Sequence, residues 1–377
     1  MDLEKFEDIR PYIDTEVSPA LERIANNPLL NDISSYLFPG KGERYFKDIL
    51  LSCETIDDFQ NKVMAVVVRK ILADTAKTLT FNGSNSFDNN QKHLIISNHR
   101  DIVLDSAIIQ IILHDNGIKT TEIAVGDNLI TSPFIEDIAR TNKMIKVIRS
   151  TSPREVYTTS QVLSQYIRYN VSSAKSSIWI AQRNGRTKDG SDLTEQGLLK
   201  MLDMSGEGDF VKDFSELHIL PVSISYEYEP CDLLKTMELF ISRRKKYVKS
   251  KNEDLNSILT GIMQFKGNIH IEFNEPILLS EIDAASQFDK NERFKALATF
   301  IDHKIISGYK LWKNNYIAYD LLNDTQEYAG MYSSTDKHSF ISYMKFKLQA
   351  MEGDSTELED IFLAIYANPV VSKKALK

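Results

Sequence analysis

The chain has 377 residues, 42% of them hydrophobic and 26% charged, which is the composition of a globular protein with a sizeable core. Its formal net charge of −8 argues against nucleic acid as a partner, because the surface as a whole repels phosphate backbones. The two cysteines, Cys53 and Cys231, argue against a disulfide framework or a cysteine-based metal site and favour a reducing compartment.

The amino-terminal stretch and the lengths of the apolar runs indicate whether a signal peptide or a transmembrane helix is to be expected. Residues Met1–Asp8 are acidic and lack a basic stretch followed by an apolar one, so we expect no signal peptide. The longest apolar runs lie near Val63–Val68 and Ala107–Leu113, far short of the roughly 18 residues that a transmembrane helix needs. We therefore expect a cytoplasmic protein that is soluble or peripheral.

Residues 1–85 have the pattern of a helical region. Apolar residues recur at helical spacing in Ile9–Ile24 and again in Phe59–Leu79. The polar stretch Asn82–Ser86 breaks this pattern and marks a plausible domain boundary. We expect a helical cap or bundle without chemistry of its own.

Residues 86–285 alternate between short apolar runs and helical stretches. Such alternation predicts an α/β domain with a mixed, largely parallel sheet flanked by helices. In sheets of this kind, sites lie at the carboxyl ends of the strands. Residues 286–377 again have helical spacing and predict a helical carboxyl-terminal extension. The strands that we expect are Leu94–Ser97, Glu122–Val125, Ile145–Ile148, Ile178–Ala181, Ile219–Ser225 and Ile269–Phe273.

The stretch His93–Asp105 combines an apolar strand with a polar turn that contains His99. A histidine at the end of a strand, held by a carboxylate through one ring nitrogen, has the other nitrogen free to act as a general base. Asp101 and Asp105 are both candidates for that carboxylate. The competing interpretation is that either aspartate caps the following helix, and one residue can do both.

Two further segments combine an apolar strand with basic residues. The strand Met144–Arg149 ends in Arg149, which is either a phosphate ligand or a surface residue. The segment Trp179–Gly190 runs from an apolar strand into a loop that holds Arg183, Arg186 and Lys188 between glycines. Backbone and guanidinium groups of such a loop can converge on an anion, and the alternative is a solvated basic turn. A third apolar segment, His218–Glu227, is predicted to be a core strand.

In this order, the segments resemble the glycerophosphate and lysophosphatidate acyltransferase superfamily over roughly residues 92–230. The family has an Asn-His motif with an aspartate five residues after the histidine, whereas here Asp105 follows His99 by six. Gln182 and Arg183 stand where the family has Glu and Gly. The resemblance implies that His99 is the catalytic base with Asp105 or Asp101 as its partner. It also implies a phosphate site that draws on Arg149, Arg183, Arg186, Lys188 and Gln182.

The resemblance further implies an activity. His99 would deprotonate a hydroxyl of glycerol 3-phosphate, lysophosphatidate or a related lipid, and that hydroxyl would attack a fatty acyl thioester. Acyl-CoA or an acyl carrier protein would be the co-substrate, with no bound cofactor and no metal. Two alternatives stay open, which are a hydrolase of acyl or phosphoryl substrates and a catalytically degenerate lipid-binding scaffold.

The segment Arg243–Lys251 is an island of positive charge in an acidic chain. It suggests peripheral association with an anionic membrane surface. A solvated helix end and a contact with the phosphates of coenzyme A are the alternatives. None of the patterns indicates an oligomeric state.

Overall fold

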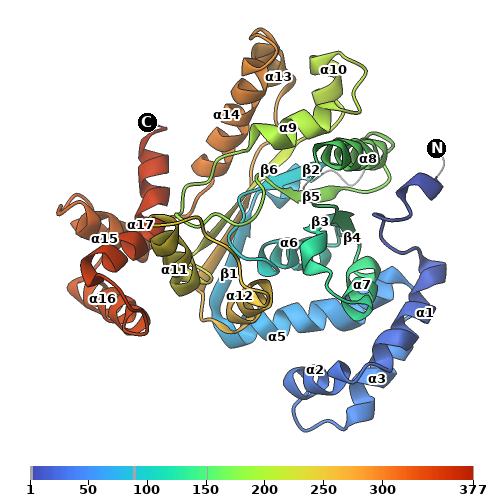
Figure 1. Cartoon of the computed structure of the whole chain (residues 1–377), viewed down its shortest axis with the longest axis horizontal. Helices are drawn as coiled ribbons and strands as arrows, with labels where there is room; N and C mark the ends of the chain where they lie inside the picture. Colours follow the sequence, from blue (N-terminus) through green and yellow to red (C-terminus); the bar gives the residue numbers. More distant parts are fainter. Residues whose placement is uncertain (1–2, 88–90, 151, 377) are drawn as a thin grey trace.

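The computed structural model describes residues 3–87, 91–150 and 152–376, and within them seven strands form one sheet (Figure 1). The strand order is β1-β7-β6-β2-β5-β3-β4. Every neighbouring pair is parallel except β6 and β7. The expected mixed, largely parallel sheet is therefore confirmed. The strands are β1 (Ala76–Asn82), β2 (Leu94–Ser97), β3 (Glu122–Gly126), β4 (Met144–Val147), β5 (Ile178–Ala181), β6 (Leu220–Tyr226) and β7 (Gly267–Phe273).

Helices cover both faces of the sheet because its central strands are apolar on both sides. All four residues of β2 are buried; Leu94 and Ile96 pack on one helical layer, and Ile95 packs on the other. The first layer contains α8 (Pro153–Ser172), α9 (Gln196–Asp203), α10 (Phe210–Ser215), α13 (Leu279–Ser286) and α14 (Glu292–Ser307). The second contains α5 (Ala65–Thr75) and α6 (Leu104–Asp115).

The two terminal regions form helical clusters of their own. Near the amino terminus, the helices pack around Leu21, Phe46 and Phe59 and against Phe134. They are α1 (Asp14–Ala25), α2 (Leu29–Leu37), α3 (Glu43–Leu51) and α4 (Ile56–Phe59), joined by α7 (Pro133–Thr141). The carboxyl-terminal cluster contains α15 (Lys313–Leu322), α16 (Ser334–Leu348) and α17 (Ser355–Lys374), packed against α11 (Asp232–Ser242). In the described part of the chain, no helix has the length and apolar character to cross a bilayer.

The parallel strands bring the expected site segments to one edge of the sheet. Because β6, β2, β5, β3 and β4 run in the same direction, their carboxyl ends lie together. β7 runs the other way, so the helix that precedes it, α12 (Glu253–Met263), also lies at this edge. We call it the carboxyl edge.

The expected strands match the observed ones to within two residues, but one strand was not expected. The helix predicted over Phe59–Leu79 ends at Thr75, and Ala76–Asn82 is β1. The helical interpretation of residues 1–85 is therefore wrong for this stretch. β1 is an edge strand whose residues are mostly exposed, and it exists because it pairs with β7, far away in the sequence.

Candidate active site

The end of β2 is held by an asparagine clamp directly before His99. The side chain of Asn98 is completely buried, and its Oδ1 accepts a hydrogen bond of 2.8 Å from the main-chain nitrogen of Ile224 on β6. Its Nδ2 donates to the main-chain oxygen of the same residue at 3.0 Å. The clamp fixes the backbone at the carboxyl edge, so the position of His99 is set by two strands.

Asp105, in the first turn of α6, is the carboxylate that contacts His99. Its Oδ2 lies 2.9 Å from His99 Nδ1 and accepts from the main-chain nitrogens of Arg100 and Asp101 at 2.5 and 2.9 Å. Its Oδ1 accepts 2.8 Å from the hydroxyl of Tyr226 on β6. Burial alone would raise the pKa of Asp105, but the hydrogen bonds from His99 and the backbone lower it below its usual value. A carboxylate that is ionised and held by four donors orients the imidazole.

Asp101 lies beside the dyad but caps the helix. Its Oδ1 accepts from the main-chain nitrogens of Val103 and Leu104 at 2.9 and 2.8 Å, and no hydrogen bond joins it to His99 in the described structure. Its Oδ2 is buried without a partner among the described residues and faces α12, where a Cβ on Gly261 would lie 2.2 Å from it. Burial and the charge of Asp105 raise the pKa of Asp101.

The second ring nitrogen of His99 is left for another molecule. The imidazole packs edge-on against Trp179 of β5, with ring centroids 5.7 Å apart. Its side chain is 13% exposed, and no described residue forms a hydrogen bond with Nε2. Since Asp105 accepts the proton of Nδ1, Nε2 is the unprotonated nitrogen of the neutral ring and can take a proton from a bound hydroxyl.

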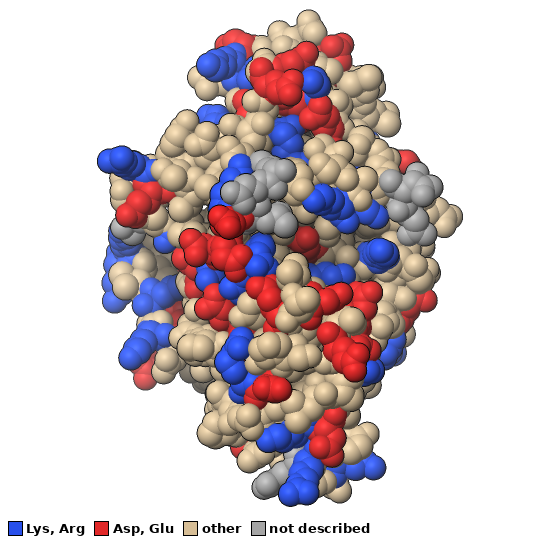
Figure 2. Space-filling view, turned by 90° about the vertical axis from the view of Figure 1, so that its right-hand side faces the viewer, with Lys and Arg blue, Asp and Glu red and all other residues tan. Residues whose placement is uncertain are grey.

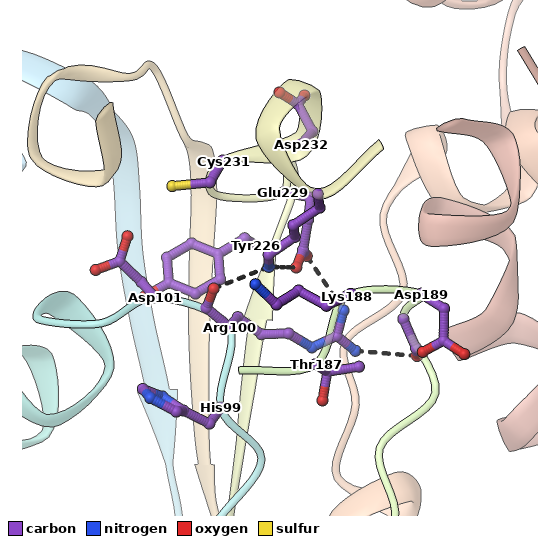
Figure 3. A network of polar contacts seen from close by, with 12 residues as sticks. His99, Arg100, Asp101, Thr187, Lys188, Asp189, Tyr226, Glu229, Cys231 and Asp232 are labelled. Carbon is purple, nitrogen blue, oxygen red and sulfur yellow. Dashed lines mark hydrogen bonds and ion pairs between the residues drawn. The ribbon is translucent and has the colours of Figure 1, made fainter. Parts of the chain in front are cut away.

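Behind the dyad lies a set of buried charges that we call the closed network, which consists of Arg100, Asp192, Glu229 and Lys235. Figure 3 shows Arg100 and Glu229 beside His99. The guanidinium of Arg100 pairs with Asp192 and, at 3.2 Å, with Glu229. Lys235 Nζ donates to Glu229 at 2.5 Å and to the main-chain oxygen of Arg100 at 2.9 Å. Each charge is matched within the network, which holds the loop between β2 and α6 in place.

The loop after β5 reaches the dyad through its backbone. The main-chain nitrogen of Thr187 donates 2.8 Å to the main-chain oxygen of His99. The preceding Arg186 is 8% exposed, and its Nη1 is buried without a hydrogen-bond partner among the described residues. Arg186 lines a cavity of about 320 Å³ beside Lys188, but the charge of Lys188 is already paired with Glu238. Arg186 therefore has donor capacity to spare.

The other predicted phosphate ligands differ in their surroundings. Gln182 is completely buried, and neither polar atom of its side chain has a partner in the described structure. Arg183 is partly exposed and lies 3.9 Å from Glu195. Arg149 is exposed and lies across the end of β3, because a Cβ on Gly126 would meet its Nε at 2.7 Å. Arg149 therefore reaches one strand closer to β2 than its own strand.

Three groups at the site were not singled out in the sequence. Tyr226 lies at the end of a segment that was predicted to be only a core strand. Its buried hydroxyl donates a hydrogen bond to Asp105. Asp192 and Glu229 neutralise Arg100. Their signal was weak, because an acidic residue in a loop is common, and only the contact with a buried arginine gives it meaning. The one clue that was present is the tyrosine hydroxyl at the carboxyl end of a fully buried strand.

Residues 78–225, from β1 to β6, match a family model described as Acyltransferase. The crystal structure of the 1-acyl-sn-glycerophosphate (LPA) acyltransferase PlsC from Thermotoga maritima aligns with a TM-score of 0.39 and 11% identity, covering 77% of this chain and 91% of that one. No curated protein matches the chain. The matched residues contain the dyad and the basic loop, and this part of the chain is therefore similar to the acyltransferase family.

Proposed function

We propose that this protein moves a fatty acyl group from a thioester to a hydroxyl of a phosphate-bearing acceptor, such as glycerol 3-phosphate or lysophosphatidate. The observation that carries the proposal is the His99–Asp105 pair at the carboxyl edge, with Nε2 of His99 left unbonded. The buried, partly unpaired Arg186 on the adjoining loop supports an anionic acceptor. The setting is phospholipid biosynthesis in the cytoplasm.

The proposed reaction needs one base and no covalent enzyme intermediate. His99 Nε2 removes the proton from the acceptor hydroxyl as its oxygen attacks the thioester carbonyl, and the imidazolium that forms is stabilised by Asp105. When the tetrahedral intermediate collapses, the carbon–sulfur bond breaks and the same proton passes to the leaving thiolate. Cys231 is an unsuitable nucleophile, because it is buried, its thiol donates to Ser257 and burial raises its pKa.

The acceptor phosphate is assigned to the 320 Å³ cavity that Arg186 lines. A charge-assisted hydrogen bond from Nη1 would give this buried donor the partner that it lacks among the described residues. Lys188 also lines the cavity but is paired with Glu238, whereas Arg149, Arg183 and Gln182 are not among its described lining residues. Arg186 is therefore expected to carry most of the recognition.

The acyl chain is assigned to a narrow apolar cavity along α6. Val103, at the N-cap of α6, and Ala107 and Ile111, on one face of the helix, line the cavity, and its lining also includes Ser106, next to Asp105, and His114. Its volume is about 50 Å³, so an acyl chain enters only when flexible side chains such as Met64 move aside. Whether acyl-CoA or an acyl carrier protein brings the chain is a separate question for assay.

The test is acyl transfer from a long-chain thioester to glycerol 3-phosphate and to lysophosphatidate by the wild type and by His99→Ala. Loss of a general base lowers the rate by about 10²- to 10⁴-fold, while the folded structure is retained. Unchanged activity in the variant would remove His99 from the mechanism. Thioester breakdown that does not depend on an acceptor would indicate the hydrolase alternative, and no turnover of either kind the scaffold.

A second variant tests the acyl cavity. Ala107→Trp places a large side chain in this cavity, so the preference for long-chain donors should shift to short-chain donors while transfer itself persists. A variant with unchanged chain-length preference would place the acyl group elsewhere.

A further inference from the structure

Helix α12 covers the candidate site with one face and presents an apolar face to solvent. Leu255, Leu259 and Met263 follow one another at intervals of four residues and are 56%, 50% and 69% exposed. Phe265, directly after the helix, is 52% exposed. Isolated exposed apolar residues are ordinary, but a line of large ones along a helix requires an explanation.

A basic segment directly precedes this apolar face. Residues 243–251 join α11 to α12 and contain six lysines and arginines. Lys245, Lys246 and Lys251 are exposed, and no ion pair joins them to a described residue. Val248, in the middle of the segment, is 79% exposed. By contrast, acidic and basic side chains are interspersed on the face that Figure 2 shows.

The opposite face of α12 belongs to the site. Gly261 lies against Asp101, and the main-chain oxygen of Ser257 accepts a hydrogen bond from Cys231. Asn256 and Ser257 line the cavity of Arg186. One helix therefore separates the site from the apolar surface, and a molecule bound to that surface lies a helix width from the cavity.

We propose that the face formed by the exposed residues of α12 and the preceding basic segment docks on an anionic lipid surface. The apolar line would enter the interfacial region of the bilayer, with the lysines at the level of the negative headgroups. A lipid surface satisfies both halves of the face, whereas an acidic protein or a coenzyme phosphate would satisfy only the charges. The docking itself does not depend on the proposed function, which it deepens by giving a lipid acceptor a short path to Arg186.

Binding of the full chain to sedimented vesicles tests the proposal. Vesicles of phosphatidylcholine and phosphatidylglycerol in equal parts should bind the protein at low salt, and pure phosphatidylcholine should bind it far less. Each lysine near a charged bilayer contributes about fivefold, so Lys245→Gln with Lys246→Gln should weaken binding about 25-fold. Leu259→Asp with Met263→Asp should weaken it at least tenfold, because the apolar face can no longer enter the bilayer.

Leu279→Asp is the matched control, since Leu279 is 61% exposed on α13 in the first helical layer. Its binding should equal that of the wild type. Absence of vesicle binding by the wild type, or equal losses in the control and in the Leu259 variant, overturns the proposal. Capture of an acidic carrier protein that depends on the lysines but not on Leu259 also overturns it.

A labelling experiment locates the contact directly. Cys53 and Cys231 are buried at 2% and 1% exposure, so a thiol-reactive, environment-sensitive dye will attach to Leu259→Cys in preference to either native thiol. Its emission should shift to the blue on the mixed vesicles, and the same dye at Leu279→Cys should not shift. His99→Ala must bind vesicles like the wild type, so that a failure of the catalytic proposal is distinguishable from a failure of docking.

Discussion

Two buried arginines, Arg100 and Arg186, lie on loops that meet at the backbone of His99, and they differ in how their charges are matched. Arg100 pairs with Asp192 and Glu229 inside the closed network. Arg186 is nearly as buried but keeps a guanidinium nitrogen without a partner in the described structure. A buried charge that is matched internally stabilises a loop, whereas an unmatched one has its capacity free for a ligand.

Arg100→Met should have the largest effect, and it tests whether the internally matched arginine stabilises the loop. The substitution leaves the buried Asp192 without its cation and Glu229 with Lys235 alone, so we expect the free energy of unfolding to fall by about 3–5 kcal/mol. Urea unfolding followed by circular dichroism measures it. A loss below about 1 kcal/mol would mean that the closed network is not what holds the loop.

Arg186→Met should behave in the opposite way. No internal ion pair is lost, so the free energy of unfolding should stay the same or rise, while the cost appears in catalysis. A charge-assisted hydrogen bond is worth about 1.5–3 kcal/mol, so acyl transfer at limiting phosphate-bearing acceptor should fall about 10- to 100-fold. Lys290→Met, at an exposed lysine outside the docking face, is the control for simple loss of charge. Equal kinetics in the two variants would contradict the assignment.

Gln182→Met extends the comparison of the two arginines to a buried polar group that carries no charge. Both polar atoms of this buried amide lack partners in the described structure, so an apolar side chain of similar size should raise the free energy of unfolding by about 1–3 kcal/mol. Thermal and urea unfolding measure the gain. If acyl transfer also falls, the amide serves to bind a substrate. If the variant is less stable than the wild type, the amide has a hydrogen-bond partner in the folded protein.

The two aspartates provide the smallest and most specific effect, which is a pH dependence of opposite sign. The folded-state pKa of Asp101 is raised, so its favourable contribution is complete below the unfolded pKa and is lost as the pH rises through the folded value. The pKa of Asp105 is lowered, so its contribution is present above the unfolded pKa of about 3.9 and is lost as the pH falls through the folded value.

Asp101→Asn should therefore be more stable than the wild type at neutral pH, since Oδ1 of the asparagine can still cap α6. Asp105→Asn should be less stable there. The difference for Asp101→Asn should vanish below about pH 4, whereas that for Asp105→Asn should shrink only at still lower pH, as the folded-state carboxylate takes up its proton. Unfolding measured across this range checks the signs, and slopes of the same sign would refute the assignment.

Much of the sheet and the position of the site were predictable from the sequence, since apolar runs mark β2, β5 and β6 and polar residues follow their ends. The choice between Asp101 and Asp105 was not. A carboxylate six positions after a histidine reaches it only because the intervening backbone turns its amides toward Asp105, which is a property of the loop and not of the spacing. The roles of His99 and Arg186 in catalysis stay predictions.

Neither the partners of Arg100 nor strand β1 could be predicted from the sequence, and the reason is related. Asp192 lies 92 positions from Arg100, so no local pattern links them. β1 follows directly on a helix and has the exposure of an edge strand, and its identity depends on a distant neighbour. Where an interaction is local, as in the helix caps, residue types are informative; where it joins remote segments, they are not.

The pairing of β1 with β7 has a consequence for the chain while it is being synthesised. Thr78 and Asn268 contact each other across 190 positions of chain. At about 5–20 residues per second, a ribosome needs about 10–40 s to make that interval. During this time β1 has no strand beside it, although α5 and most of the sheet have already been synthesised. A nascent chain halted before β7 should therefore expose an open backbone edge, which is the kind of surface that chaperones shield.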